Sequence, residues 1–178
     1  MPFNQIKIYP ELLELAHLNE AQRTVSLKAI FKRDIEDNPG LNFRTKIIRP
    51  IKGEEPSMQI LFKHLTCEEV ITENEDGSKY GQRVFELQRS LRLHWVRHHI
   101  EEKKKNNIEV FSVEERDLRK RKDVIKTYIY DLEQDYVIVL EPQRSGTDYY
   151  LLTAYYLNKP EGKKSIQKKL KKRLSLIH

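Results

Sequence analysis

The sequence predicts an α+β fold: N-terminal helices, one helix that carries histidine and arginine, an antiparallel β-meander, and a basic C-terminal helix. Three observations support this prediction. Runs of β-prone residues follow one another at 124–131, 136–141 and 149–157, with connectors too short for a parallel crossover. A helical pattern precedes these runs, and a lysine-rich helical pattern follows them.

Composition limits the class of protein. The 178 residues carry 33 Lys+Arg against 27 Asp+Glu, a net charge of +6, and this length favours one domain or one domain with an appendage. No stretch approaches the roughly 18 apolar residues that a membrane span needs, and the N-terminus lacks the order of a secretory signal. A single cysteine, Cys67, agrees with a reducing compartment. We therefore expect a soluble, cytoplasmic protein that does not contact a membrane.

The N-terminal part, residues 10–37, is predicted to form a pair of helices. Asn19 and Gln22 have the spacing of a reciprocal N-cap for the second helix. An Asn-Pro-Gly sequence at 38–40 is expected to end it.

Three shorter elements are expected next. Residues 43–51 are β-prone, and Pro50 places this strand at a sheet edge or at its own end. A short helix is predicted at 58–64 and a β-hairpin within 69–87. Residues 1–80 are thus expected to be a mostly helical region of unknown role, joined in one compact unit with a second part, 81–178.

A helix is predicted from Ser90 to about Lys104, and it has two distinct sides. Leu93, Val96 and Ile100 point to one side, and the opposite side carries His94, Arg97, His98 and Glu101. Histidine exchanges protons near neutral pH and arginine holds phosphate in two-point contact. This trio of His94, Arg97 and His98 suits RNA cleavage without a metal, and a solvated polar face is the alternative.

The meander carries hydroxyl groups that suit the same chemistry. Thr127 lies in the first predicted strand, and Thr153 and Tyr155 share one face of the last. They could contact a scissile phosphate or stack on bases, although threonine and tyrosine are also ordinary strand residues. Arg144, in the turn before the last strand, could reach a phosphate. The charged tract 113–123 is expected to be a short helix or an exposed loop.

The C-terminal segment holds most of the net charge. Residues 159–178 sum to +7, so residues 1–158 sum to −1. An apolar stripe of Ile166, Leu170 and Leu174 is expected to dock on the sheet. The lysines are expected to neutralise RNA phosphates, with an anionic membrane or an acidic protein as alternatives; the RNA-binding candidates are Lys163, Lys164 and Lys168.

A zinc site is a further alternative. The pairs His64 with Cys67 and His94 with His98 have local spacings found among zinc ligands, but the full pattern is poor in thiols.

Four segments together resemble the Barnase-EndoU-colicin-RelE group of ribonuclease toxins, over about residues 83–173. They are RSLRLHWVRHH (89–99), KTYIYD (126–131), YVIVLEP (136–142) and DYYLLTAYYLNKP (148–160). The resemblance implies helices packed on one face of a curved antiparallel sheet, with RNA bound on the open face.

The resemblance also implies an endoribonuclease that needs no cofactor and acts as a growth-inhibiting toxin controlled by an antitoxin protein. Carried over by position, the catalytic residues would be His94, Arg97, His98, Thr127, Thr153 and Tyr155. The first 80 residues have no counterpart in this group. A non-catalytic module that binds RNA or DNA through the basic C-terminal helix is the alternative function.

Overall fold

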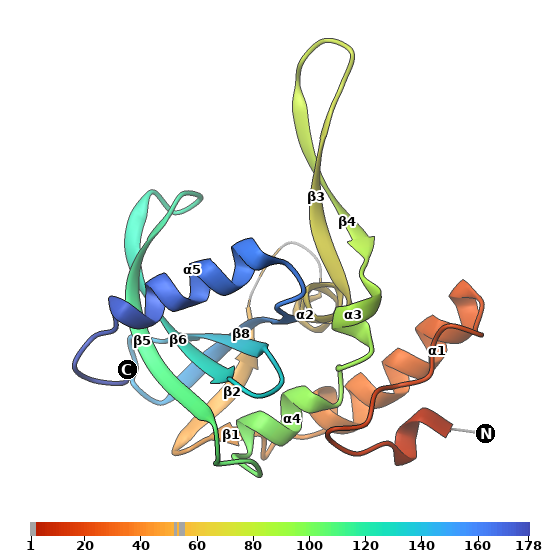
Figure 1. The fold of residues 1–178 in the computed structure, drawn as a ribbon, viewed down its shortest axis with the longest axis horizontal. Coiled ribbons are helices and arrows are strands. Elements are labelled where there is room, and N and C mark those ends of the chain that lie inside the picture. The colour runs from red at the N-terminus through yellow and green to blue at the C-terminus, as the bar shows by residue number, and fades with distance from the viewer. Residues whose placement is uncertain (1–2, 52, 54–55) are drawn as a thin grey trace.

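The fold is α+β, as predicted. The computed structural model describes residues 3–51, 53 and 56–178, and within these it has five α-helices, a six-stranded sheet and a two-stranded sheet (Figure 1). The six-stranded sheet has the order β1-β2-β8-β7-β6-β5. Its strands are β1 (Asn42–Phe43), β2 (Lys46–Pro50), β5 (Ile108–Asp117), β6 (Lys122–Asp131), β7 (Tyr136–Pro142) and β8 (Asp148–Tyr156).

Four consecutive strands, β5 to β8, pair antiparallel, in agreement with their short connectors. The sheet as a whole is mixed, because β2 pairs parallel with β8. The long chain segment between β2 and β8 permits this parallel pairing. An entirely antiparallel sheet, which the family resemblance implied, is therefore wrong for this edge.

The prediction of a short helix or exposed loop at 113–123 is wrong for most of this tract, in which only residues 118–121 form an exposed turn. This tract forms the end of β5 and the start of β6, and the two strands pair from Ile108↔Asp131 to Asp117↔Lys122. The charges are accommodated across the strands: Lys126 lies 3.7 Å from Glu115, and Arg116 lies 3.4 Å from Asp123. Cross-strand ion pairs of this kind allow a tract with few apolar residues to remain a strand.

The N-terminal region contains one α-helix where two were predicted. Helix α1 (Glu20–Phe31) continues into a π-helical turn at Lys32–Glu36, and a 3-10 turn covers Phe3–Ile6. The reciprocal cap is confirmed, since Asn19 and Gln22 each bond the other's backbone N–H, at 2.9 and 3.0 Å.

Residues 10–18 are not helical. Leu13 and Leu15 are both buried, a spacing of two that suits an extended segment rather than a helix face. The Leu13 N–H donates to the Leu91 carbonyl over 3.0 Å. This segment is therefore bonded to the part of the chain that precedes helix α4 (Trp95–Ile100).

The central elements agree with the prediction. Helix α2 (Ser57–Thr66) leads into a hairpin of β3 (Cys67–Glu73) and β4 (Lys79–Phe85). Figure 1 shows this hairpin projecting away from the rest of the molecule. Strand β3 follows α2 directly, and His64 of α2 and Arg83 of β4 line the same depression of the surface.

The predicted helix over residues 90–104 is replaced by two short helices, α3 (Leu87–Ser90) and α4 (Trp95–Ile100). The residues of the turn between them, Arg92, Leu93 and His94, are all buried. A single surface helix would keep one side in water. Burial on all sides explains why the chain turns here instead of continuing as one amphipathic helix.

Two apolar clusters cover the two faces of the six-stranded sheet. One joins α1, α2 and α4 to sheet residues that include Ile138 and Leu151. The other joins helix α5 (Pro160–Lys171) to Val137 and Val139 on the opposite face. Ile166 is buried and Leu170 half-buried in this second cluster, so the predicted docking of the C-terminal helix on the sheet is confirmed. Among the described helices, none is long and apolar enough to cross a membrane.

Candidate active site

An open groove lies on the same face of the sheet as α5, between that helix and the base of the β3–β4 hairpin. Its volume is about 570 Å³. Strands β6, β7 and β8 contribute to its walls, together with α2, α3 and α5. We call it the sheet-face groove. Five of its residues are cationic and two are acidic: Arg83, Arg89, Arg116, Lys126 and Lys169 against Glu69 and Glu115. The groove therefore favours an anionic ligand.

His64, near the end of α2, is the histidine of this groove. Its Nδ1 lies 3.0 Å from the Leu152 carbonyl oxygen of β8. A carbonyl only accepts hydrogen bonds, so Nδ1 carries the proton of the neutral ring and Nε2 has the free lone pair. Burial, followed by the positive charge of Arg83, lowers the pKa of His64 below its usual value. His64 is therefore a neutral imidazole at neutral pH and can accept a proton.

Arg89, in α3, links the elements around His64. Its Nη1 donates to the carbonyls of His64 and Cys67, over 2.8 and 2.7 Å, and contacts Thr153 Oγ1 at 3.3 Å. Its Nε is buried and has no hydrogen-bond partner among the described residues. Burial lowers the pKa of Arg89 from a very high value, and arginine remains charged in proteins. A fixed positive charge thus lies beside the imidazole.

Two tyrosines line the groove. The Arg89 guanidinium lies 5.9 Å from the ring centroid of Tyr155, and burial raises the pKa of Tyr155. Tyr128 donates to Glu115 Oε2 over 2.6 Å and accepts from Lys169 over 3.2 Å, and burial raises its pKa too. Both phenols keep their protons at neutral pH, so they can act as hydrogen-bond donors.

Of the residues predicted to be catalytic, Thr153 and Tyr155 line this groove and Thr127 does not. Thr127 is fully buried, lies 2.8 Å from Ser112 Oγ and donates to the His178 carbonyl over 2.8 Å. Side chains alternate along a strand, and Lys126 and Tyr128 face the groove. Thr127 must therefore face the other side of the sheet.

His94 does not lie on an exposed helix face, contrary to the prediction. Its side chain is buried at the start of α4, and Nε2 lies 2.9 Å from the Glu11 carbonyl, which also accepts from Trp95 Nε1 over 3.1 Å. Burial lowers the pKa of His94 to about 4. The ring holds the N-terminal segment against the body of the protein.

Arg97 and His98 are half-buried and engaged elsewhere. Arg97 Nε donates to Glu101 over 2.7 Å, and its Nη1 lies 3.7 Å from Asp34. The His98 ring stacks on Tyr9 with 4.5 Å between centroids. Helix α4 packs on the sheet face opposite the groove, so the structure separates these residues from Thr153 and Tyr155.

The predicted RNA-binding residues are distributed over two places. Arg144 is exposed in the turn between β7 and β8, outside the sheet-face groove. Lys164 and Lys168 are exposed on α5, and Lys163 Nζ forms an ion pair with Asp135 at 2.7 Å. Lys169, another of the C-terminal lysines expected to neutralise RNA phosphates, is the α5 residue that lines the groove.

The four residues proposed as zinc ligands do not come together. Within the part of the chain that the structure describes, no three His, Cys, Asp or Glu side chains lie close enough to hold a metal ion. His64 lines the sheet-face groove, whereas His94 lies at the start of α4 and His98 within it, and α4 packs in the apolar cluster of the opposite sheet face.

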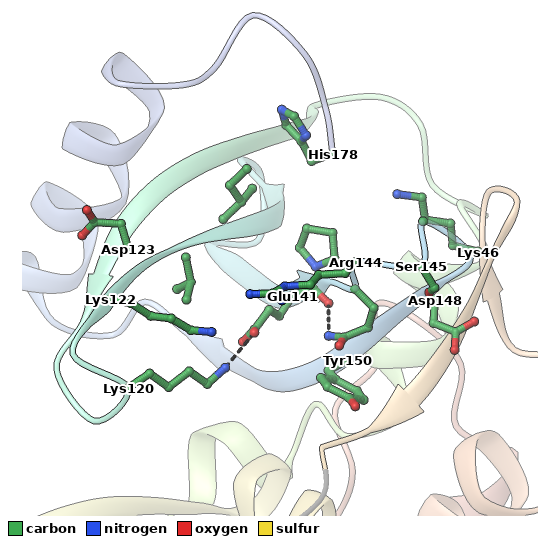
Figure 2. A pocket seen from close by; sticks show the side chains of 15 residues that line it. Lys46, Lys120, Lys122, Asp123, Glu141, Arg144, Ser145, Asp148, Tyr150 and His178 are labelled. Carbon is green, nitrogen blue, oxygen red and sulfur yellow. Dashed lines mark hydrogen bonds and ion pairs between the residues drawn. The ribbon is translucent and has the colours of Figure 1, made fainter.

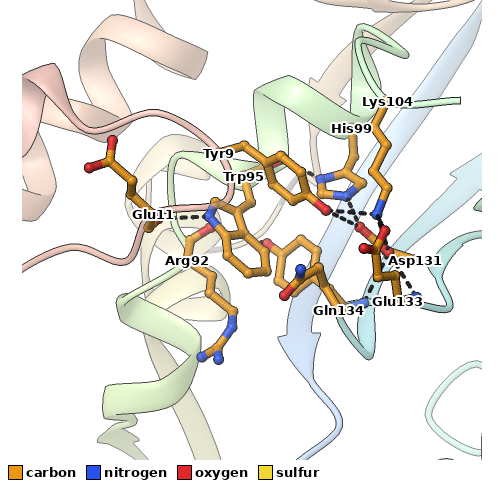
Figure 3. A network of polar contacts seen from close by, with 10 residues as sticks. Tyr9, Glu11, Arg92, Trp95, His99, Lys104, Asp131, Glu133 and Gln134 are labelled. Atoms are coloured by element: carbon orange, nitrogen blue, oxygen red, sulfur yellow. Dashed lines mark hydrogen bonds and ion pairs between the residues drawn. The ribbon is translucent and has the colours of Figure 1, made fainter. Parts of the chain in front are cut away.

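A second polar cluster, not foreseen from the sequence, lies beneath α4 (Figure 3). Asp131 is fully buried and contacts His99 Nε2 at 2.8 Å, the Tyr9 hydroxyl at 2.9 Å and Lys104 Nζ at 3.0 Å. Burial opposes ionisation of Asp131, but these contacts outweigh it and hold its pKa well below the usual range. The cluster joins the N-terminal segment, α4 and β6, which is a structural role.

The sequence did not predict that Arg83, Arg89 and His64 would line one groove. Arg89 lies within the RSLRL segment, but no sequence signal places α2 and the hairpin beside β8. Comparison with models of protein families, with curated proteins and with solved structures gives no match. The fold and the site thus define an α+β protein with a cationic groove that holds one neutral histidine and two protonated tyrosines.

Proposed function

We propose that the protein is a metal-independent RNA endonuclease that acts at the sheet-face groove. One observation carries the proposal: a neutral imidazole, His64, and a fixed guanidinium, Arg89, are both bonded to β8 in a groove with an excess of positive charge. A base next to a cation is the combination that transesterification of RNA requires.

The chemistry assigns one role to each group. His64 Nε2 accepts the proton of the ribose 2′-OH, and the 2′-oxygen attacks the adjacent phosphorus. Arg89 and Arg83 stabilise the negative charge that builds up on the phosphorane. The P–O bond to the 5′-oxygen breaks, and the Tyr155 hydroxyl donates a proton to this leaving oxygen. The products are a 2′,3′-cyclic phosphate and a 5′-hydroxyl.

This assignment replaces His94, Arg97, His98 and Thr127 as catalytic candidates and keeps Tyr155. Thr153, 3.3 Å from Arg89 Nη1, would orient the guanidinium. The family resemblance adds a biological role, in which such an enzyme in the cytoplasm inhibits growth and an antitoxin protein covers the groove. Brief induced expression should then arrest growth and cleave cellular RNA at defined ends.

The reaction should proceed in the presence of excess EDTA. Purified protein incubated with RNA is expected to leave 2′,3′-cyclic phosphate and 5′-hydroxyl ends, because the 2′-oxygen is the nucleophile. Replacing the ribose at a mapped cleavage position by 2′-deoxyribose should abolish cleavage there. Products with 5′-phosphate ends, or cleavage that requires a divalent cation, would contradict the proposal. RNA retention with no products under any condition would favour the non-catalytic binding module.

Cleavage should depend on pH through His64. The base must be neutral, so kcat/KM is expected to rise with pH through the His64 pKa, which lies below its usual value because of burial and Arg83. Replacing Arg83 by glutamine removes a positive charge that disfavours the imidazolium. The acid limb of the profile should therefore move to higher pH. A pH–rate profile of both proteins, with NMR titration of the His64 ring, measures the shift; an unmoved limb would show that His64 is not the titrating base.

A further inference from the structure

A second hollow lies beyond the sheet-face groove, at the end of the sheet where β7 turns into β8. Its volume is about 790 Å³ (Figure 2). Side chains enter it from β2, from the β5–β6 turn with β6, and from the β7–β8 turn. We call it the end hollow. Lys46, Lys122, Arg144 and Tyr150 are the residues of interest here.

Strands β6 and β8 contribute side chains to both the end hollow and the groove, at successive positions along each strand. On β6, Lys122 lines the end hollow and Lys126 lines the groove. On β8, Tyr150 lines the end hollow and Leu152 lines the groove. Side chains an even number of positions apart on a regular strand share a sheet face, and the four-residue step from Lys122 to Lys126 spans about 13 Å. The part of the end hollow that Lys122 and Tyr150 form is therefore next to the groove on one sheet face. Lys46 and His178 approach the hollow from the other face, where both contact Tyr149.

Acidic residues of the end hollow are each held by an arginine or a lysine. Glu141 pairs with Lys120 at 2.7 Å, as drawn in Figure 2. Asp148 pairs with Arg49 at 2.6 Å, and Asp123 pairs with Arg116 at 3.4 Å; the three carboxylates of the hollow are Asp123, Glu141 and Asp148.

These three ion pairs leave the positive charge of Lys46, Lys122 and Arg144 uncompensated by the carboxylates of the hollow. Figure 2 shows Lys122 and Arg144 in the same hollow as Tyr150, whereas Lys46 Nζ lies 4.7 Å from the ring centroid of Tyr149. Tyr150 is half-buried, so one part of its ring is accessible. Cations that flank an aromatic ring are the arrangement by which proteins bind single-stranded nucleic acid: the cations contact phosphates, and the ring stacks on a base.

We propose that the end hollow is a second binding subsite for single-stranded RNA, which runs from the groove along β6 and β8 and places a phosphate against Lys122 and Arg144 and a base on Tyr150. This inference rests on the proposed function of the groove and specifies its substrate: an unpaired strand longer than the cleaved dinucleotide. RNA bound in this way should be cleaved more efficiently than a dinucleotide, because the outer contacts add binding energy away from the reacting phosphate.

The test compares a double charge reversal with a matched control. In Lys122→Glu/Arg144→Glu both subsite cations are reversed; in Lys28→Glu/Lys105→Glu the same change is made at two exposed lysines outside both depressions. Binding is measured by fluorescence anisotropy with a 12-nucleotide single strand that is 2′-O-methylated throughout and so cannot be cleaved. Cleavage is measured separately on an unmodified 12-mer and on a dinucleotide.

The subsite variant should bind the 12-mer at least ~10-fold more weakly than the control variant, with a salt dependence reduced by about two phosphate contacts. Its KM for the 12-mer should rise, and its cleavage of the dinucleotide should match the control. Tyr150→Ala should weaken binding several-fold without changing the salt dependence, in contrast to Tyr80→Ala on the exposed hairpin. Equal affinities of the two double variants would overturn the inference. If wild-type protein cleaves neither substrate but the binding difference persists, the subsite stands and the catalytic proposal fails.

Discussion

Replacing His64 by alanine is expected to lower the rate of RNA cleavage by about 10²–10⁴-fold, the usual contribution of a general base. The matched control is His98→Ala, which removes an imidazole that stacks on Tyr9 on the opposite side of the sheet. It should change the rate by less than about threefold, because His98 does not contact the groove where we place the phosphate. Cleavage rates under single-turnover conditions measure both.

The folded state of these variants must be checked, because His64 also bonds the Leu152 carbonyl. His64→Gln keeps a polar side chain at this position but supplies no base near neutral pH, so it should be as inactive as His64→Ala with a melting temperature closer to wild type. If a folded His98→Ala or His94→Ala variant were inactive while His64→Ala remained active, catalysis would belong to the α4 region, as the sequence alone predicted.

Replacing Asp131 by alanine should reduce the free energy of unfolding by about 3–5 kcal/mol, the usual cost of removing one partner of a buried charge network. The carboxylate is fully buried and accepts hydrogen bonds from Tyr9, His99 and Lys104. Without it His99 Nε2 loses its partner, Lys104 keeps only Tyr9 and Glu133, and the N-terminal segment loses one of its anchors. Asp135→Asn is the control, because the Asp135–Lys163 pair is partly exposed and asparagine tolerates the positive φ of 51° at this position, so loss of the pair should cost far less. Urea denaturation measures both; equal values would show that the network does not stabilise the fold.

The Asp131 network also makes stability depend on pH. Its carboxyl has a depressed pKa in the folded protein and an ordinary one, about 3.9, in the unfolded chain. The resulting stabilisation is complete above the unfolded pKa and is lost as the pH falls below it, because the unfolded chain then binds a proton that the folded one does not. Denaturation between pH 6 and pH 3 should therefore show a steeper loss of stability in wild-type protein than in Asp131→Ala.

Local signals were sufficient for the elements that are determined by near neighbours in the chain. The Asn19 and Gln22 cap, the β3–β4 hairpin and the antiparallel order of β6, β7 and β8 all follow from turn residues, spacing and connector length. The docking of α5 through Ile166 follows from its helical period. These features depend on a few adjacent residues, so the sequence contains the information directly.

Errors arose where distant parts of the chain determine the local structure. The amphipathic pattern over residues 90–104 predicted an exposed His94, but the segment around Glu11 and Leu13 covers this region and buries the ring. In the same way, most of the charged tract at 113–123 is strand, because its first residues, in β5, pair with the start of β6. A pattern in one segment does not show whether another segment will cover it.

The sequence alone determined the α+β class, most of the strands and a basic C-terminal helix. It also indicated Thr153 and Tyr155 as candidates, and both line the groove. Only the tertiary structure decided which histidine joins them, because His64, Arg89 and Tyr155 belong to α2, α3 and β8 and meet through long-range contacts. It also decided that Thr127 faces away, since a one-residue step along a strand reverses the side chain. Periodicity along one element predicts which residues share a face, whereas the packing of elements determines which faces meet.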